Sequence, residues 1–415
     1  MTGSGQATPV WLDLTRLVSR VGRGVLTGID RVELAWLRHL LSEGNPATRY
    51  LVRTTRGYLL LDQRGAAKLA AVVAGERAAG PADLLSRLLR KGSNPRHRVE
   101  ATLRPLAVDR ALPSRLPRLI ERQSPAGFIY LNLGHANLSQ ATLGTFAASG
   151  RARVAVLIHD LIPITHPDLV AEGMPESFAG RLERVRTHAD LVLCNSAATA
   201  ADLAAHWHSA PHRPPTSVVH LGVDPVPRVT GQRDPRRFVM LGTIEPRKNH
   251  ALMLDVWEVL AAELRPDQMP DLHIIGPVGW RVEALMERIA AHPLKNRSIH
   301  RHGPLSEAEV HAHLASATAL LFPSLAEGFG YPPLEAAMMG ALPICSDLPV
   351  FRETLGHSAV YLDVRDAYSW SDTIKKHVLG IETLPALPTP EVPGWPAHFD
   401  QVNRALAGIE RKGQE

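Results

Sequence analysis

The sequence predicts an α/β protein made of two doubly wound, Rossmann-like domains that face one another across a cleft. Short apolar runs alternate with helical patterns from about residue 128 to residue 221, and the alternation restarts at residue 238 and continues to residue 362. Strands that alternate with helices indicate a parallel sheet covered on both faces. A stretch rich in Pro, Arg, Gly and Asp at residues 225–235 separates the two series and indicates a linker. Open α/β sheets bind ligands beyond the carboxyl ends of their strands, so the cleft is the expected site.

The amino-terminal domain is expected to span residues 1–228. It opens with an apolar piece and a glycine-containing turn that ends at Thr27-Gly28, and the spacing of Val32, Leu37 and Leu40 predicts a helix after that turn. Further strands are expected at residues 50–54, 57–62, 128–133, 154–158, 191–194 and 217–221. Further helices are expected at residues 66–73, 178–186 and 197–206.

The carboxyl-terminal domain is expected to span residues 229–392. A Pro-rich crossover follows, and the tail at 393–415 contains a helical pattern that we expect to cross back to the first domain. Strands of the second domain are expected at residues 238–241, 272–275, 298–300, 319–322, 342–345 and 360–362. Its helices are expected at residues 250–264, 282–291, 307–316 and 333–339.

A basic segment interrupts the first domain at about residues 87–122. Its Arg and Lys residues far outnumber its acidic ones and are interleaved with Leu and Pro. We interpret it as an insertion exposed at the surface. Two hypotheses stay open for it: a solvated arm, or a segment that contacts a membrane surface or a lipid-phosphate acceptor.

Composition excludes several classes of protein. With 45% hydrophobic and 21% charged residues, the chain has an ordinary globular composition. It has neither the start of a secretory signal nor an apolar run of the roughly 18 residues that a membrane-spanning helix needs. Cys194 and Cys345 each lie in or beside an apolar run, which indicates buried thiols rather than disulfides or a zinc site. We expect a cytoplasmic location, peripheral on the inner face of the cytoplasmic membrane if the basic segment touches it.

The charge balance suits anionic partners. The net charge is +5 and the isoelectric point is about 9.4, a balance that favours phosphorylated substrates or acidic headgroups. We do not expect nucleic acid to bind, because the chain lacks zinc-finger spacing and aromatic ribonucleoprotein motifs and has only 5% aromatic residues.

The strongest motif pairs two glutamates around a glycine-rich loop. The sequence Glu327-Gly-Phe-Gly-Tyr-Pro-Pro-Leu-Glu335 follows a predicted strand and opens a predicted helix. Gly328 and Gly330 allow a close approach of the backbone, and a helix start offers N–H donors to hydroxyls or phosphate. Each carboxylate can accept hydrogen bonds from a pair of vicinal hydroxyls, as found in sugars and ribose. The pattern therefore predicts a site for a polyhydroxylated ligand.

A second motif, Gly242-Thr-Ile-Glu-Pro-Arg247-Lys248-Asn249, follows the first strand of the second domain. Two cations at a strand-to-helix turn predict an anion site, which would neutralise a diphosphate as it leaves. We expect Asn249 to cap the helix that follows. The chain contains no Asp-X-Asp, the usual carboxylate pair for a nucleotide-bound metal. We therefore expect no metal and no other cofactor, with Arg247 and Lys248 in place of the cation.

These two motifs resemble those of the retaining glycosyltransferases of family 4, which have the two-domain GT-B fold. Shorter stretches at Gly276-Pro-Val-Gly-Trp, His302-Gly303-Pro-Leu305 and Gly222-Val-Asp224 add to the resemblance. It is specific over about residues 220–360 and loose in the amino-terminal half. It implies transfer of a sugar from a nucleotide-sugar donor with retention of configuration, the leaving diphosphate helping to deprotonate the acceptor.

The resemblance also implies a role for individual residues. Arg247 and Lys248 would hold the diphosphate, and Glu327 would position the sugar. The remaining donor-side residues are expected to be Glu335 at the ribose, Gly328, Phe329 and Gly330 at the sugar, Gly242, Gly276, Gly303 and Leu305 around the nucleotide, and Thr27 and Gly28 in the first domain. His159 would touch the donor sugar, with Asp160 and His135 on the acceptor side. The first loop departs from the family's adjacent glycines.

Several identities stay open. GDP-mannose is the first donor expected and a deoxythymidine- or UDP-sugar the second, with a saccharide or lipid-linked acceptor in bacterial surface polysaccharide synthesis. The alternatives are a nucleotide-sugar epimerase of the same architecture and a catalytically silent scaffold for polysaccharide assembly. His166, His220 and His273 are interpreted as core or surface residues.

Overall fold

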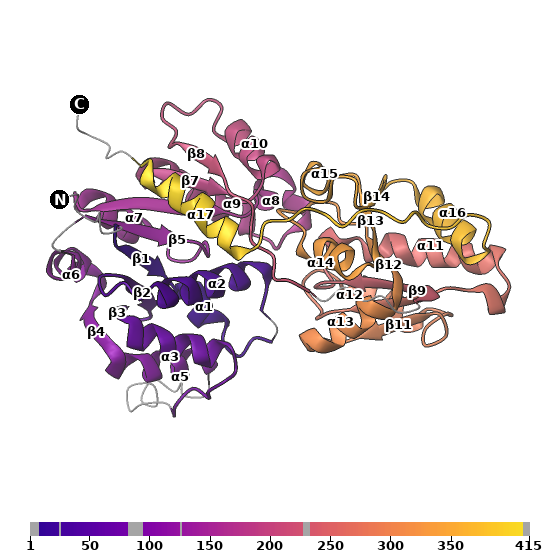
Figure 1. Cartoon of the computed structure of the whole chain (residues 1–415), viewed down its shortest axis with the longest axis horizontal. Coiled ribbons are helices and arrows are strands. Elements are labelled where there is room, and N and C mark those ends of the chain that lie inside the picture. The colour runs from indigo at the N-terminus through magenta and orange to yellow at the C-terminus, as the bar shows by residue number, and fades with distance from the viewer. Residues whose placement is uncertain (1–7, 25, 82–93, 125–126, 227–232, 410–415) are drawn as a thin grey trace, which may run out of the picture.

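The computed structural model describes residues 8–24, 26–81, 94–124, 127–226 and 233–409. Figure 1 shows two α/β halves side by side, each built on its own sheet. One sheet has eight strands and the other has six. The predicted class, two doubly wound α/β domains, is confirmed.

The first sheet has the strand order β4-β3-β2-β1-β5-β6-β7-β8. From β2 through β1 to β8, every neighbouring pair is parallel. The central strands are near-continuous apolar runs because helices cover both faces of this part of the sheet. The strand bounds are β1 (Val10–Asp13), β2 (Arg49–Thr54), β3 (Gly57–Leu61), β4 (Ala107–Ala111), β5 (Phe128–Asn132), β6 (Ala152–Ile158), β7 (Leu191–Cys194) and β8 (Thr216–Val218).

One edge of this sheet departs from the predicted parallel arrangement. β3 runs antiparallel to both β2 and β4. Only residues 55 and 56 connect β2 to β3, and so short a connection can join antiparallel strands but not parallel ones. The two-residue gap between the strands predicted at residues 50–54 and 57–62 therefore already indicates an antiparallel pair.

The expectation of a surface insertion at 87–122 is wrong for its described part. Residues 94–124 belong to the domain: α5 (Pro95–Leu103) and α6 (Leu116–Gln123) flank the edge strand β4 and bury apolar side chains such as Val99 and Leu119. Several of the basic side chains are paired inside the domain, Arg96 with Glu100 and Arg122 with Asp109 among them. Residues 87–93 lie outside the described residues. Nowhere in the described chain is a helix both long and apolar enough to span a bilayer.

Helix α2 begins with a capping box. The Thr27 hydroxyl accepts from the Asp30 N–H, and the Asp30 carboxylate accepts from the Thr27 N–H. Asp30 is fully buried, with its charge balanced by Arg16 and Arg20. The helices of this domain are α1 (Thr15–Arg20), α2 (Gly28–Glu43), α3 (Gln63–Val73), α5, α6, α7 (Gln140–Ala148), α8 (Ile162–Thr165), α9 (Met174–His188) and α10 (Ala197–His206).

The second sheet is parallel throughout, with the order β11-β10-β9-β12-β13-β14. Its strands are β9 (Asp234–Leu241), β10 (Asp271–Ile275), β11 (Ile299–His302), β12 (Ala317–Phe322), β13 (Leu342–Ser346) and β14 (Val360–Leu362). Its helices are α11 (His250–Glu263), α12 (Glu283–Ala291), α13 (Glu307–Ser316), α14 (Tyr331–Met339), α15 (Pro349–Leu355) and α16 (Ala367–Val378). The predicted thiols Cys194 and Cys345 are free and buried.

The last helix, α17 (Trp395–Ala407), lies against the first domain (Figure 1). The Trp36 indole N–H on α2 donates to His398 Nε2 at 3.0 Å, and the Trp36 and Phe399 rings pack edge to face. Near the hinge, an added Cβ on Gly222 would lie 2.6 Å from Trp395, so the close packing requires glycine. The predicted domain boundary at 228/229 falls outside the described residues.

Candidate active site

The two motifs of the second domain meet at the carboxyl ends of neighbouring strands. The cationic turn, a 3₁₀ helix at Pro246–Lys248, follows β9, and the glycine-rich loop follows β12. The backbone joins them, since the Leu325 N–H donates to the Arg247 carbonyl at 2.8 Å. The Arg247 guanidinium in turn donates to the Ala326 carbonyl at 2.9 Å. The turn and the loop therefore form one structure.

Their charged side chains form a compact cluster. Glu327 Oε1 lies 2.5 Å from Lys248 Nζ and 2.6 Å from Arg247 Nη1. Arg247 also pairs with Glu245 at 2.6 Å. The Lys248 ammonium lies 4.1 Å from the centre of the Phe322 ring, a cation–π contact. We call Arg247, Lys248 and Glu327 the charged cluster.

Lys248 is buried, Arg247 and Glu327 are mostly buried, and the two cations set the ionisation of Glu327. Burial alone would raise the pKa of this carboxyl, but the charges of Arg247 and Lys248 outweigh that effect and lower the pKa to about 2. Glu327 is therefore ionised at neutral pH and balances part of the positive charge. An incoming diphosphate would compete with Glu327 for the two cations.

The predicted side-chain cap at Asn249 is wrong. Asn249 occupies the position before α11, but its backbone is left-handed, with φ of 53°, and its side chain makes no cap hydrogen bond. Asn249 directly follows the 3₁₀ turn at Pro246–Lys248 and is the last residue before α11. Asn tolerates the left-handed region better than most residues.

The glycines beside the turn have different surroundings. Gly242 and Gly276 have positive φ, and a Cβ on Gly276 would lie 2.1 Å from the Gly242 carbonyl oxygen. Gly276 is thus required by the close approach of two strand ends. Gly303 is exposed, with nothing within 4 Å of the position of its Cβ, whereas Leu305 lines the cavity between the domains.

The first domain brings its predicted residues to the same loop. A Cβ on Gly328 would lie 2.2 Å from the His159 carbonyl oxygen and 3.0 Å from the Asp160 Cβ. The approach of the first domain, rather than of a ligand, is what requires glycine at position 328 in this structure. Ser196 Oγ adds a hydrogen bond to the Gly328 carbonyl at 3.2 Å.

Three predicted residues of the first domain follow β5 and β6: His159 is buried, whereas His135 and Asp160 are partly buried. His159 Nε2 contacts the Leu133 carbonyl at 2.6 Å, and the His159 N–H donates to His135 Nε2 at 3.2 Å. Burial lowers the pKa of His159 to about 4 and lowers that of His135 well below its usual value, so both rings are neutral at pH 7. Burial raises the pKa of Asp160, against the charge of Arg247.

The remaining donor-side residues shape the loop and its surroundings. Phe329 is buried against Tyr331, and Gly330, with φ of 95°, is the N-cap residue before α14. The helix start offers fewer N–H donors than expected because Pro332 and Pro333 follow, and proline has no N–H. Gly28 faces Tyr331 across the domains, and a Cβ added to this glycine would lie 3.1 Å from the tyrosine ring.

Glu335 is tied to the first domain. Arg31 Nη1 on α2 lies 2.5 Å from Glu335 Oε1, and Arg31 Nη2 lies 3.3 Å from Asp224 Oδ2. The Arg31 guanidinium also stacks over the Tyr331 ring at 4.8 Å. We call Arg31, Asp224 and Glu335 the cross-domain group. Arg31 was not predicted as a site residue, although it directly follows the capping sequence Thr27-Gly-Ile-Asp30, which predicts a helix start facing the cleft.

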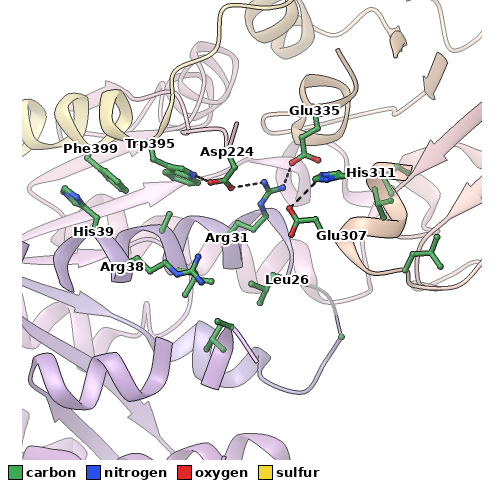
Figure 2. Close-up of a pocket in the computed structure, with 18 of the residues that line it drawn as sticks. Leu26, Arg31, Arg38, His39, Asp224, Glu307, His311, Glu335, Trp395 and Phe399 are labelled. Carbon is green, nitrogen blue, oxygen red and sulfur yellow. Dashed lines mark hydrogen bonds and ion pairs between the residues drawn. The ribbon is translucent and has the colours of Figure 1, made fainter. Parts of the chain in front are cut away.

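A cavity of about 890 Å³ lies between the domains at this group. Its volume suits a small-molecule ligand. Figure 2 shows Arg31 reaching across the cavity to Glu335, with Arg38 and His39 on the same helix and Glu307 and His311 on α13 opposite. The cavity reaches Glu335 and Leu305 among the predicted donor residues, whereas the charged cluster is not part of its lining.

Comparison with known proteins identifies the class of fold. The chain aligns with the lipopolysaccharide outer core galactosyltransferase WaaB in its apo form, with a TM-score of 0.58 and 16% identity over 96% of this chain and 98% of WaaB. It aligns with Anabaena HepE in complex with UDP-glucose with a TM-score of 0.57 and 12% identity, over 97% of this chain and all of HepE. The fold is GT-B.

Sequence comparison adds a family match and relatives that cover about half of the chain. Residues 227–382 match the family described as glycosyl transferases group 1. The serotype-specific mannosyltransferase WbdA of Escherichia coli is 34% identical over 225 residues, which are 49% of this chain and 27% of WbdA. The O-antigen chain mannosyltransferase RfbU of Salmonella typhimurium is 27% identical over 233 residues, 55% of this chain and 61% of RfbU. The chain thus spans about a quarter of WbdA, and the matches support a glycosyltransferase.

Proposed function

We propose that this protein is a retaining, metal-independent glycosyltransferase of the family 4 type. It would move a sugar from a nucleotide-sugar, GDP-mannose first, to a saccharide or lipid-linked acceptor in bacterial surface polysaccharide synthesis. The observation that carries the proposal is the meeting of Arg247, Lys248 and Glu327 at the strand ends beside the cleft. The names of WbdA and RfbU, both mannosyltransferases of polysaccharide synthesis, support the choice of sugar.

The geometry suggests how the cluster would act. Glu327 holds both cations in place in the free protein. A donor diphosphate would take over Arg247 and Lys248, which stabilise the charge that develops on the leaving group. Glu327, released from them, could accept hydrogen bonds from sugar hydroxyls and position the sugar. The diphosphate oxygen would help deprotonate the acceptor hydroxyl on the same face.

The first domain would supply the acceptor side. His159 and Asp160 follow β6 and contact the loop that carries Glu327. A neutral His159 can donate or accept a hydrogen bond without adding charge next to Arg247. We infer a cytoplasmic location, with any peripheral membrane contact made through the exposed side chains of Arg110, Arg115 and Arg118.

A thermal-shift panel of nucleoside diphosphates and nucleotide sugars, with and without EDTA, tests the proposal. A ligand that binds the folded state raises the melting temperature by mass action. We expect one base series to stabilise the protein, the shift to be the same with EDTA, and Lys248→Ala to reduce it strongly. Lys295→Ala, which removes an exposed lysine of the same domain, is the control. If no nucleotide stabilises the protein, a silent scaffold is the better hypothesis.

A further inference from the structure

Three histidines gather in the second domain away from the charged cluster. His273 lies on β10, His302 ends β11 and His313 lies on α13, and one ring nitrogen from each lies within 4.8 Å of the other two. His273 Nδ1 and His302 Nε2 are 3.0 Å apart. β10 and β11 are paired in register, so the sheet fixes the separation of two of the rings. Within the motif His302-Gly-Pro-Leu, Gly303 and Leu305 are predicted to lie around the nucleotide, whereas no role is predicted for the His302 imidazole.

We propose that His273, His302 and His313 form a binding site for one divalent transition-metal ion, such as Zn²⁺, with a fourth position open to water. Imidazole nitrogens suit Zn²⁺, Ni²⁺ and Cu²⁺. Nitrogen ligands lie about 2.0 Å from Zn²⁺, so two of them in a tetrahedral site are roughly 3.3 Å apart. The observed separation of 3.0 Å between His273 Nδ1 and His302 Nε2 is close to that value.

The surroundings leave the rings ready to bind a cation. His313 Nδ1 is buried without a hydrogen-bond partner among the described residues, and an unsatisfied buried polar atom carries an energetic cost. His302 and His313 are only half-buried, which leaves a path from solvent. Burial, helped by Arg237, lowers the pKa of His273 to about 3, so this ring is in the neutral, metal-binding form.

Charged groups near the site act in both directions. Arg237 faces all three rings and opposes a second cation, although its guanidinium is held by the Ser316 hydroxyl at 2.9 Å. Glu309 on α13 attracts positive charge towards His313. His300 stacks on His273 and contacts Asp271 at 3.4 Å. The site therefore has three neutral imidazole ligands. The one positive charge that opposes metal binding, Arg237, can be removed by substitution.

None of the three histidines is among the residues that line the cavity. Helix α13 contributes Glu307, Val310 and His311 to the cavity and His313 to the histidine cluster. A bound ion would tie α13 to β10 and β11 and so stabilise the second domain. This role is separate from catalysis, which the proposed function assigns to the charged cluster without a metal.

Cobalt titration of the full, tag-free chain tests the proposal. After treatment with EDTA and dialysis, Co²⁺ should bind with one equivalent per chain and give the visible absorption of a low-coordinate ion. His302→Gln should weaken binding on the order of 100-fold, at the upper end of the losses caused by second-shell changes. Arg237→Gln should strengthen it roughly tenfold, the factor that one pKa unit represents. His311→Gln, on the same helix, should bind as the wild type does.

A measurement on the unaltered protein guards against variants that fail to fold. X-ray absorption of the Zn²⁺-loaded wild type should show three imidazole nitrogens at about 2.0 Å. Oxygen-dominated coordination, less than one equivalent of Co²⁺, or equal binding by the wild type and a folded His302→Gln would overturn the site. EDTA should lower the melting temperature of metal-loaded protein without changing the shift caused by nucleotide, so this proposal and the proposed function can fail independently.

Discussion

Glu327 and Glu335 flank the same loop, with seven residues between them, yet they are held by different parts of the molecule. Glu327 is bound by Arg247 and Lys248, both from its own domain. Glu335 is bound by Arg31, which reaches it from the first domain. The charged cluster is therefore complete within one domain, whereas the contact between Arg31 and Glu335 exists only while the domains are close together.

This difference implies two kinds of response to a ligand. On the proposed function, the charged cluster would receive a diphosphate whatever the arrangement of the domains, because every member lies on the same two loops. Glu335 can offer both carboxylate oxygens to a diol only after Arg31 shares or releases one of them. Substitutions at the two glutamates should therefore change different steps.

Exchanging each glutamate for glutamine tests most directly whether Glu327 and Glu335 act at different steps. Glu327→Gln should lower the rate of transfer by about 10²–10³-fold, the usual cost of losing one preorganised group at a reaction centre. It should bind bare nucleoside diphosphate at least as tightly as the wild type, because Arg247 and Lys248 lose their competitor. Glu335→Gln should show the reverse, with weaker binding of bare nucleotide. Calorimetric titration and steady-state rates measure both; equal losses of nucleotide affinity would contradict this division.

Much of this molecule could be predicted from sequence because its signals are local. Apolar runs of the second domain correspond to strands, and the two motifs lie at the strand ends where they were expected. The convergence of Lys248 and Glu327 also follows from topology, since β9 and β12 lie side by side in the sheet. The individual functional roles of these residues stay predictions.

What could not be predicted depends on contacts between distant segments. The pairing of Arg31 with Glu335 joins residues 304 positions apart, and neither has a local pattern that specifies the other. The edge strand β4 was not predicted from the basic segment that contains it. Its half-buried and exposed residues alternate, which is typical of a strand at a sheet edge and not of a core strand. The histidine cluster likewise forms only when β10, β11 and α13 assemble.

Acid should weaken the contact of α17 with the first domain before it weakens the charged cluster. Burial lowers the pKa of His398 to about 4, and the neutral ring accepts from Trp36 and donates to the His220 carbonyl. Its stabilising effect is complete above its unfolded pKa of 6.5 and is lost as pH falls towards 4, a loss of about 3 kcal/mol. The effect of Glu327 is present above pH 4.5 and is lost only as pH falls towards 2.

The variant His398→Gln isolates this effect, because an amide can keep both hydrogen bonds but cannot be protonated in this range. Urea unfolding at about pH 7 and about pH 4 should show a smaller loss of unfolding free energy in the variant than in the wild type. His159 and His250, whose pKa values burial also lowers to about 4, contribute equally to both proteins and cancel. The same loss in both proteins would show that His398 does not sense pH.

The smallest expected effect concerns the Arg31 contact itself. Arg31→Ala frees Glu335, so bare nucleoside diphosphate should bind about fivefold more tightly, the equivalent of ~1 kcal/mol for a partly exposed ion pair. Arg38→Ala is the matched control, because it removes a cation from the same helix and cavity but leaves the Glu335 pair intact. Calorimetric titration distinguishes the two outcomes. Weaker binding in Arg31→Ala alone would mean that Arg31 contacts the donor directly, and Glu335 would then serve to position Arg31 rather than to hold the ribose.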